Sequence, residues 1–269
     1  MKHFLSIKDL SGGELRYIIE KAAEIKRNPK KYSSVMKDRT LLMIFEAPSL
    51  RTRLSFETGM LQMGGHAIFY TTGESTLGKK ESMKDFSRVA SRYVDIIMAR
   101  LFSHADIEEL AKYSTVPVIN GMTNAEHPCQ IAGDFLTMFE KRKKIKKIAY
   151  VGDCNNNVTN SLLYAAAILG IDIAVASPEG KEFEPDKNVI NGCKRIAKKT
   201  SAEISVFYDA KKAVKDADFV HTDSWMSYRI PKEREASRLG ALKPFQVNSQ
   251  LMKYSGNAVF MHCLPAKRG

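Results

Sequence analysis

The chain has 269 residues, of which 44% are hydrophobic and 27% charged, and this composition supports one large or two ordinary folded domains and excludes intrinsic disorder. Its 42 basic and 30 acidic residues give a net charge of +12, which fits either a nucleic-acid binder or an enzyme for anionic substrates. No run approaches the roughly 18 apolar residues of a membrane-spanning helix, so we expect no membrane association.

Two features bear on the compartment. Residues 1–9 turn polar too early for a signal peptide, so we expect a cytoplasmic protein. The cysteines are widely spaced and form no CxxC pair, which argues against a zinc site or a disulfide scaffold and fits a reducing compartment; they are Cys129, Cys154, Cys193 and Cys263.

The N-terminal half predicts alternating helices and strands. Residues 12–27 carry apolar side chains on one helical face, and Ser11 with Glu14 forms a capping box at its start. Further helices are predicted near 51–63, 81–92, 105–113 and 128–143. Short apolar runs between them predict strands near 41–45, 67–70, 95–100 and 117–120.

A basic run at residues 141–147 separates this half from the next. It lies where a helix ends, a position that suits cations, and no aromatic residue interrupts it to stack on bases. We therefore expect a solvated linker and no nucleic-acid partner. Beyond it a helix is predicted at 157–169, and strands are predicted at 148–151, 172–177, 203–208, 218–222 and 257–262, with helical stretches between them.

Apolar strands that alternate with helices indicate parallel sheets covered on both faces. We therefore predict an α/β fold with two doubly wound parallel-sheet domains, residues 1–143 and 144–269, and a cleft between them. Ligands of such sheets bind beyond the carboxyl ends of the strands. The residues that follow each strand are consequently the candidates for a functional site.

The strand at 41–45 leads into Ser49-Leu50-Arg51-Thr52-Arg53 at a helix start. Hydroxyl groups, backbone N–H groups of the first turn and fixed positive charges together make a phosphate site. Arginine in the first turn opposes the helix dipole, and a bound anion would offset that cost. The alternative is a capping serine followed by exposed arginines.

Two later strands of this half end in polar groups. Arg100 ends the strand at 95–100, and His127-Pro128-Cys129-Gln130 opens the helix after the strand at 117–120. Pro128 suits the first helical turn, which places His127 and Gln130 at the helix start. A lone histidine is more often structural, but three successive strand ends with such groups favour a site for an oxyanion and a phosphate.

The second half places polar groups at strand ends too. Gly152-Asp153 and residues 154–157 follow the strand at 148–151 without the G-x-G-x-x-G of dinucleotide sites. Asp223 and Ser227 follow the strand at 218–222, and His262-Cys263-Leu264-Pro265 ends the last one. Each alone could be ordinary loop chemistry, whereas their repeated placement at strand ends favours a site for a small polar ligand.

These segments, in this order, resemble the ornithine carbamoyltransferases of the aspartate/ornithine carbamoyltransferase superfamily. The resemblance covers nearly the whole chain. S-x-R-T-R with H-P-x-Q marks the superfamily, while H-C-L-P and the Asp223/Ser227 pair mark its ornithine branch. It implies transfer of the carbamoyl group of carbamoyl phosphate to the side-chain amine of L-ornithine, giving L-citrulline for arginine biosynthesis, without a metal or an organic cofactor.

The resemblance also implies residue roles. Catalysis is assigned to Arg100, His127, Asp223 and Cys263. Carbamoyl phosphate is assigned to Ser49, Leu50, Arg51, Thr52, Arg100, His127, Gln130, Cys263 and Leu264. Ornithine is assigned to Asn156, Asp223, Ser227 and Tyr228. The resemblance further implies a homotrimer or a multiple of one, in which Lys80 comes near the site of an adjacent subunit.

Two departures from the family pattern affect these expectations. Relatives have methionine and glycine after the serine of the acceptor loop, where this chain has Tyr228-Arg229, so lysine and putrescine stay open as acceptors. Relatives also continue past H-C-L-P into a further arginine and a C-terminal helix, so we expect the second domain to lack that helix within residues 144–269.

Overall fold

The computed structural model describes residues 2–74, 81–226 and 230–267. The chain divides into two compact units, Met1–Leu136 and Thr137–Gly269. The division falls within helix α5 (Pro128–Lys141). The domain boundary that we placed after residue 143 stays a prediction. Each unit contains one parallel β-sheet, as the alternation of strands and helices predicted.

The sheet of the first unit has four parallel strands in the order β2-β1-β3-β4. All four strands lie within about two residues of their predicted bounds. They are β1 (Thr40–Phe45), β2 (His66–Thr71), β3 (Ile96–Arg100) and β4 (Val118–Met122).

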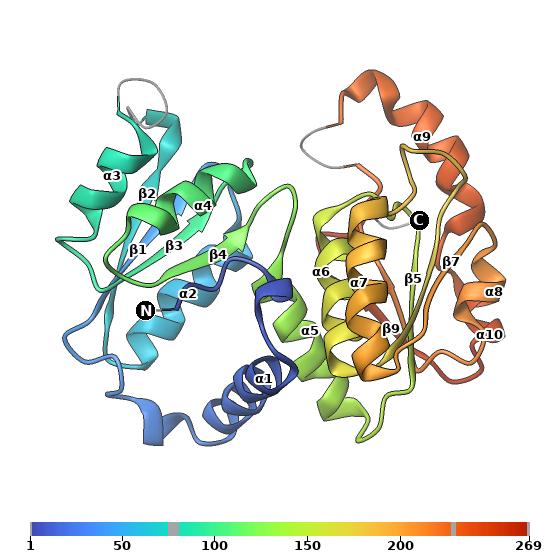
Figure 1. The fold of residues 1–269 in the computed structure, drawn as a ribbon, viewed down its shortest axis with the longest axis horizontal. Helices are drawn as coiled ribbons and strands as arrows, with labels where there is room; N and C mark the ends of the chain where they lie inside the picture. Colours follow the sequence, from blue (N-terminus) through green and yellow to red (C-terminus); the bar gives the residue numbers. More distant parts are fainter. Residues whose placement is uncertain (1, 75–80, 227–229, 268–269) are drawn as a thin grey trace. The chain divides into compact units, whose positions relative to one another are not determined.

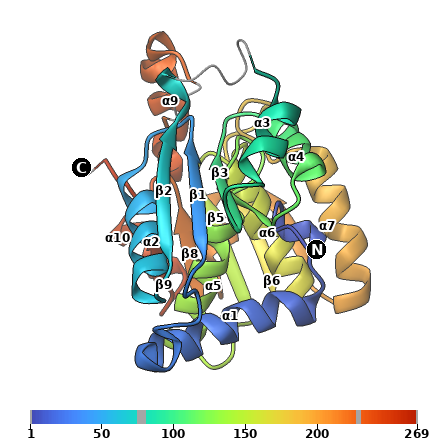
Figure 2. The same cartoon turned by 90° about the vertical axis from the view of Figure 1, so that its left-hand side faces the viewer.

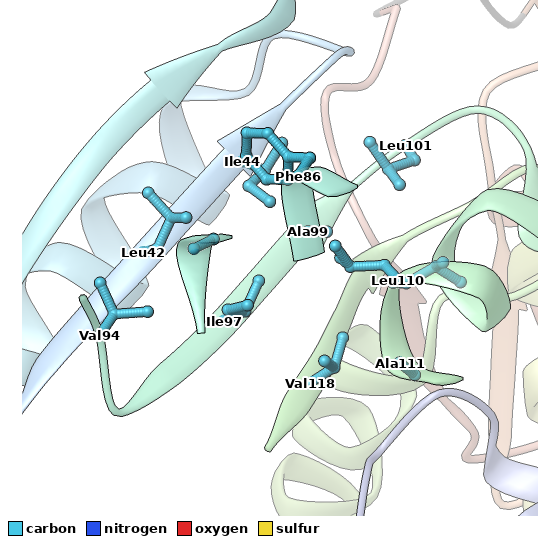
Figure 3. Close-up of a cluster of buried hydrophobic side chains, with 12 residues drawn as sticks. Leu42, Ile44, Phe86, Val94, Ile97, Ala99, Leu101, Leu110, Ala111 and Val118 are labelled. Carbon is cyan, nitrogen blue, oxygen red and sulfur yellow. The ribbon is translucent and has the colours of Figure 1, made fainter. Parts of the chain in front are cut away.

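Both faces of this sheet are covered because successive side chains of a strand point to opposite faces. Leu42 and Ile44 pack into the buried cluster under α3 (Met83–Ala90) and α4 (His104–Tyr113), and Figure 3 shows this cluster. The other face packs against α2 (Leu50–Gln62), which lies on the opposite side of the sheet in Figure 2, through Leu41, Met43 and Phe45.

The N-terminal segment of this unit carries α1 (Gly12–Arg27), and its predicted capping box is confirmed. Ahead of α1, Phe4 forms a parallel bridge with Ile119 beside β4, which the sequence pattern did not predict. Short 3₁₀ helices occur at Ile7–Asp9, Pro29–Tyr32 and Thr72–Glu74.

The sheet of the second unit has five parallel strands in the order β7-β6-β5-β8-β9. All five correspond to predicted strands. They are β5 (Lys147–Val151), β6 (Asp172–Ala176), β7 (Ile204–Phe207), β8 (Phe219–Thr222) and β9 (Val259–His262).

Helices cover both faces of this second sheet. On one face α6 (Asn157–Leu169) lies beside α7 (Lys187–Thr200) (Figure 1). On the other, α8 (Ala210–Val214) packs on an alanine- and valine-rich cluster together with α10 (Ser249–Tyr254). The remaining elements are α9 (Glu235–Leu242) and 3₁₀ helices at Lys232–Arg234 and Lys243–Phe245. No helix in the described part of the chain has both the length and the apolar character that a bilayer crossing requires.

The strand order reverses between β1 and β3 in the first sheet and between β5 and β8 in the second. Open parallel sheets bind ligands outside the carboxyl ends of the strands at such switch points. Each unit therefore has one place where the fold favours a ligand, and the polar strand-end residues predicted from the sequence follow these strands.

Candidate active site

The switch point of the first unit contains the predicted phosphate loop. Ser49 caps α2 in an extended conformation, and its hydroxyl oxygen accepts a hydrogen bond from the Thr52 backbone N–H at 3.3 Å. The same hydroxyl donates to the Thr52 Oγ1 at 3.0 Å. Leu50 begins the helix with an exposed side chain. Its backbone N–H and those that follow lie at the positive end of the helix dipole, the arrangement that binds anions.

Arg100 reaches this loop from the neighbouring strand. The parallel register places Arg100 beside Phe45, the last residue of β1. Its side chain is buried, donating from Nε to the Ala47 carbonyl at 3.1 Å and from Nη1 to the Thr52 hydroxyl at 3.4 Å. The predicted meeting of Arg100 with the Ser49–Thr52 turn is therefore observed.

His127 lies close to Arg100 and directly precedes Pro128, the first residue of α5. Burial, and to a smaller extent the positive charge of Arg100, lower the pKa of His127 to about 3. The imidazole is consequently neutral at physiological pH. A neutral imidazole still has one N–H to donate, which suits it to stabilise a developing oxyanion.

Three other residues predicted for the site of this unit, Arg51, Gln130 and Arg53, differ in their surroundings. Arg51 is exposed in the first turn of α2, and Gln130 donates to the Asp134 carboxylate at 3.0 Å within α5. Arg53, which we included in the phosphate loop, instead pairs with Glu57 at 3.0 Å and lies 4.0 Å from the Phe69 ring centroid. A phosphate role for Arg53 stays a prediction, and in this structure its guanidinium pairs with an acidic side chain one turn along the helix.

The switch point of the second unit begins with Asn156, which caps α6. Its Oδ1 accepts from the Thr159 N–H at 2.8 Å. Its Nδ2 donates to the Tyr150 hydroxyl at 2.9 Å and to the Asp153 carbonyl at 2.6 Å. Both amide hydrogens are thus used within the protein. In this structure the Asn156 side chain stabilises the loop and the start of α6, and its amide hydrogens are not available to a ligand unless one of these bonds is exchanged.

The ends of β8 and β9 bring three further groups together. The Cys263 thiol donates to the Asp223 Oδ1 at 2.9 Å, although these residues lie 40 positions apart in sequence. The Leu264 N–H donates to the His262 Nδ1 at 2.8 Å, and Leu264 has a φ of 58°. Burial lowers the pKa of His262, with the negative charge of Asp223 opposing that shift.

Asp223, His262 and Cys263 also form a group whose possible metal-ligand atoms all lie within 4.8 Å of one another. We predicted no metal from the sequence, because the four cysteines are widely spaced. Ligands from two strand ends that meet only in the folded sheet leave no such spacing signal. The chemistry considered below needs no metal at this place.

Three predicted residues lie outside the described part of the chain: Lys80, Ser227 and Tyr228. The sequence did not predict the pairing of Asp153 with Arg238, because this contact appears only after folding. Asp153, directly after β5, carried a signal because polar residues at strand ends are candidates. Arg238, buried in α9, carried none because a helical arginine is normally exposed.

The two sets of residues differ in chemistry. The first unit offers a helix N-terminus, two hydroxyls, a buried guanidinium and a neutral imidazole, which together suit a phosphate with an adjoining carbonyl group. The second offers a carboxylate beside a thiol, together with the polar cap of α6, which suits an amine-bearing ligand.

Two family models match the chain. Residues 2–140 match the carbamoyl-phosphate-binding domain of aspartate/ornithine carbamoyltransferases, and residues 144–269 match the aspartate/ornithine-binding domain. The ornithine carbamoyltransferase of Anoxybacillus flavithermus is 45% identical over 275 residues, covering 100% of this chain and 86% of that protein. The anabolic ornithine carbamoyltransferase of Pyrococcus furiosus is 44% identical, covering 100% and 85%.

Solved structures give the same result. The ornithine carbamoyltransferase from Pyrococcus furiosus matches with a TM-score of 0.94 and 44% identity, covering 100% of this chain and 86% of that one. The ornithine transcarbamoylase from Giardia lamblia matches with a TM-score of 0.89 and 40% identity, covering 99% and 86%.

Proposed function

Because the chain belongs to the aspartate/ornithine carbamoyltransferase family, we propose that it carbamoylates the side-chain amine of L-ornithine with carbamoyl phosphate, releasing L-citrulline and phosphate. It is an enzyme of the transferase class. One observation supports the chemistry most: Thr52, Arg100 and His127 gather at the carboxyl ends of neighbouring parallel strands.

In this proposal the first unit binds carbamoyl phosphate. Ser49, the Leu50 backbone and Thr52 lie around the start of α2, where the phosphate oxygens find N–H and O–H donors. Arg51, exposed in the same turn, would close on the phosphate with a charge-assisted hydrogen bond. Gln130 and Leu264 are further proposed contacts to the carbamoyl end.

Reaction begins when the neutral amine attacks the carbonyl carbon. The new C–N bond forms and the carbonyl oxygen gains negative charge. The C=O bond then re-forms as the C–O bond to phosphate breaks, with its electron pair leaving on the phosphate, and the departing phosphate accepts the proton that the attacking nitrogen gives up. Thr52, Arg100 and the neutral His127 would stabilise the oxygen, since preorganised donors at a developing oxyanion contribute strongly to catalysis. The imidazole of His127 is neutral at neutral pH, and it can donate a hydrogen bond to the oxygen without changing its own charge during the reaction.

The second unit would bind ornithine. Asp223 supplies a carboxylate for the α-amino group, and Cys263 lies within hydrogen-bonding distance of it. Ser227 and Tyr228, outside the described residues, complete the proposed set. Asn156 stays a proposed contact, and its amide would exchange one of its present hydrogen bonds for one to the ligand.

We propose a homotrimer, or a multiple of one, with Lys80 near the site of an adjacent subunit. β2 is an edge strand of its sheet. The exposed apolar side chains of α2 and β2 support self-association of the first unit. They are Leu50, Leu54, Leu61, Ile68 and Phe69. Light scattering after size exclusion should give about three times the chain mass of 30.2 kDa, and Ile68→Glu should reduce it.

We further propose a cytoplasmic location. Cys154 and Cys193 are fully buried, which fits cysteines used as small core residues in a reducing compartment. The Pyrococcus furiosus relative is named anabolic, and we propose the same direction here, citrulline synthesis for arginine biosynthesis.

A panel of acceptors tests the proposed activity. Ornithine, lysine and putrescine would each be incubated with carbamoyl phosphate, and the ureido product and phosphate measured together. We expect turnover with ornithine. Turnover with lysine or putrescine alone would assign the chain to a sister enzyme, and no turnover with any amine would overturn carbamoyl transfer.

A further inference from the structure

Arg238 is the most buried arginine described in the second unit, with only 3% of its surface exposed. Its guanidinium contacts segments that follow three different strands. It donates from Nη1 to the Glu182 carboxylate at 2.8 Å and from Nη2 to the Asp153 carboxylate. It also donates to the Trp225 carbonyl, from Nε at 3.2 Å and from Nη2 at 3.1 Å.

Arg238 thus contacts the two segments that carry the proposed ornithine residues Asp223 and Asn156. Trp225 lies two positions after Asp223 in the same segment, so the bonds to its carbonyl restrain the backbone that carries the Asp223 carboxylate. Asp153 shares the Nη2 of this guanidinium with the Trp225 carbonyl, and its own carbonyl accepts from the Asn156 amide. One buried side chain thus supports both ends of the proposed acceptor site.

The packing around Trp225 leaves little freedom. Its indole lies against Gly152, where a Cβ atom would be 3.4 Å from the Trp225 Nε1 and 3.3 Å from the Thr222 Oγ1. Gly152 also has a φ of +132°, which side-chain-bearing residues rarely adopt. The acceptor segment is therefore held by close packing on one side and by the Arg238 hydrogen bonds on the other.

The positive charge of Arg238 stabilises the ionised form of the buried Asp153 carboxylate. Burial raises the pKa of Asp153, and the positive charge of Arg238 opposes this shift. Without the guanidinium, the Trp225 carbonyl would lose these hydrogen bonds and the buried Asp153 Oδ2 would lose its charged partner, leaving the carboxylate with the Asn155 N–H on Oδ1. An unsatisfied buried group is costly, so the segments would move until water reached them.

We infer that Arg238 is a positioning residue of this enzyme, which sets the affinity for the amino-acid acceptor by holding the Asp223–Trp225 segment against Asp153. It touches neither substrate in this account. The inference rests on the proposed ornithine carbamoyltransferase activity, and it adds a residue on α9 to the acceptor site.

Arg238→Met tests the inference, because methionine keeps much of the apolar stem and removes every donor. Arg234→Met is the matched control, since Arg234 is a half-exposed neighbour whose guanidinium, among the described residues, pairs with the same Glu182 at 2.6 Å. We expect Arg238→Met to raise the KM for ornithine by about tenfold or more, leaving the KM for carbamoyl phosphate within about twofold. Arg234→Met should change neither.

A second readout does not depend on turnover. Trp225 is the single tryptophan of the chain, which also has 10 tyrosines, so tryptophan emission excited selectively over tyrosine reports on the acceptor segment. Arg238→Met should shift the emission to longer wavelength, and Arg234→Met should leave it unchanged. Arg238→Lys, which keeps the charge with a smaller donor set, should fall between the two and decides the question if Arg238→Met does not fold.

The outcomes separate the two hypotheses. A wild-type protein without ornithine turnover would remove the proposed activity, whatever the fluorescence shows. Active wild type with a folded Arg238→Met or Arg238→Lys that leaves both the ornithine KM and the Trp225 emission unchanged would overturn the positioning role. An equal rise in both KM values would also overturn it, because the effect would not be confined to the acceptor.

Discussion

The Arg100 guanidinium donates a hydrogen bond to the Thr52 hydroxyl at 3.4 Å, joining the end of β3 to the first turn of α2. Thr52 accepts a second hydrogen bond from the Ser49 hydroxyl at 3.0 Å. A hydroxyl oxygen that accepts twice still has its own hydrogen to donate. Ser49 and Arg100 therefore occupy the two acceptor positions of the Thr52 oxygen, and its hydrogen is left to be donated to a ligand.

The first prediction concerns this donor. Thr52→Val keeps the shape of the side chain and removes the hydroxyl, so kcat should fall by about 10²–10³, the typical loss of one oxyanion donor. Thr52→Ser retains the hydroxyl and should keep most of the activity. Steady-state kinetics with both substrates checks the pair. Similar rates for the valine and serine variants would show that the hydroxyl does not act in the transition state.

Arg51 and Arg53 lie two positions apart in sequence but have different contacts. Replacing each in turn therefore provides a second test. Arg51→Ala should weaken carbamoyl phosphate binding by about 1.5–3 kcal/mol, as expected for a hydrogen bond to a charged group, with a smaller effect on ornithine. Arg53→Ala removes an exposed ion pair with Glu57, which is usually worth about 1 kcal/mol or less, and should spare substrate binding. Calorimetric titration with carbamoyl phosphate measures both. Equal losses would contradict the phosphate role of Arg51.

His127 predicts a particular dependence of stability on pH. Its folded pKa of about 3 lies below the ordinary value of 6.5, so the unfolded chain binds more protons between these values and stability rises with pH there. The contribution is complete above pH 6.5 and is lost as the pH falls toward 3. At pH 5 the loss should be about 2 kcal/mol, from about 1.4 kcal/mol per pH unit.

Comparison with His127→Gln isolates this contribution. Urea unfolding of both proteins at pH 7.5 and pH 5 should show a smaller difference between the two pH values for the glutamine variant. The other histidines are present in both proteins and cancel. Wild-type kcat should show no change attributable to His127 between about pH 5 and 8, because the imidazole stays neutral throughout. An equal pH effect on both proteins would place the folded pKa of His127 near its ordinary value.

Cysteine reactivity gives a fourth, chemical test. Burial raises the pKa of Cys129 to about 12 and raises that of Cys154 as well, and Cys193 is fully buried. Cys263 is half-buried beside Asp223. Iodoacetamide should therefore label Cys263 first, as read by peptide mass spectrometry, and saturating ornithine should slow that labelling by about tenfold.

Cys263→Ser serves as its control and should abolish the fast-labelling product. Protection by ornithine in the wild type would support a place for Cys263 beside the acceptor. Labelling at the same rate with and without ornithine, under conditions where turnover proves that ornithine binds, would move Cys263 out of the site.

The sequence predicted much of this architecture because apolar runs and turn residues are local signals. Each strand of both sheets was expected, and so was the capping role implied by Ser49 before α2. The ion pair of Arg53 with Glu57, four residues later, was not predicted, although that spacing favours such a pair in a helix. Arg238 and the saturation of the Asn156 amide were beyond prediction. The contacts of Arg238 join segments that only the strand order brings together. Those of Asn156, with Tyr150 and Asp153, are local, but no sequence pattern indicates them.

The N-terminal segment illustrates the same limit and leads to the last prediction. The Ser6 hydroxyl donates to the Glu126 Oε1 at 2.7 Å, and both residues are almost fully buried. Glu126 directly precedes His127, and its backbone exchanges hydrogen bonds with Thr123. No local pattern links residue 6 to this loop. The contact restrains the backbone from which His127 projects.

Ser6→Ala should therefore affect both stability and catalysis. It removes a hydrogen bond from a buried carboxylate, which should cost about 1–3 kcal/mol, and the loosened loop should lower kcat by about tenfold through His127. Ser11→Ala is the matched control, because it breaks the capping box of α1 at about 1 kcal/mol without touching the loop. Thermal unfolding and kcat would be measured for both. If the two variants lose stability and neither loses kcat, the Ser6–Glu126 contact serves the fold alone.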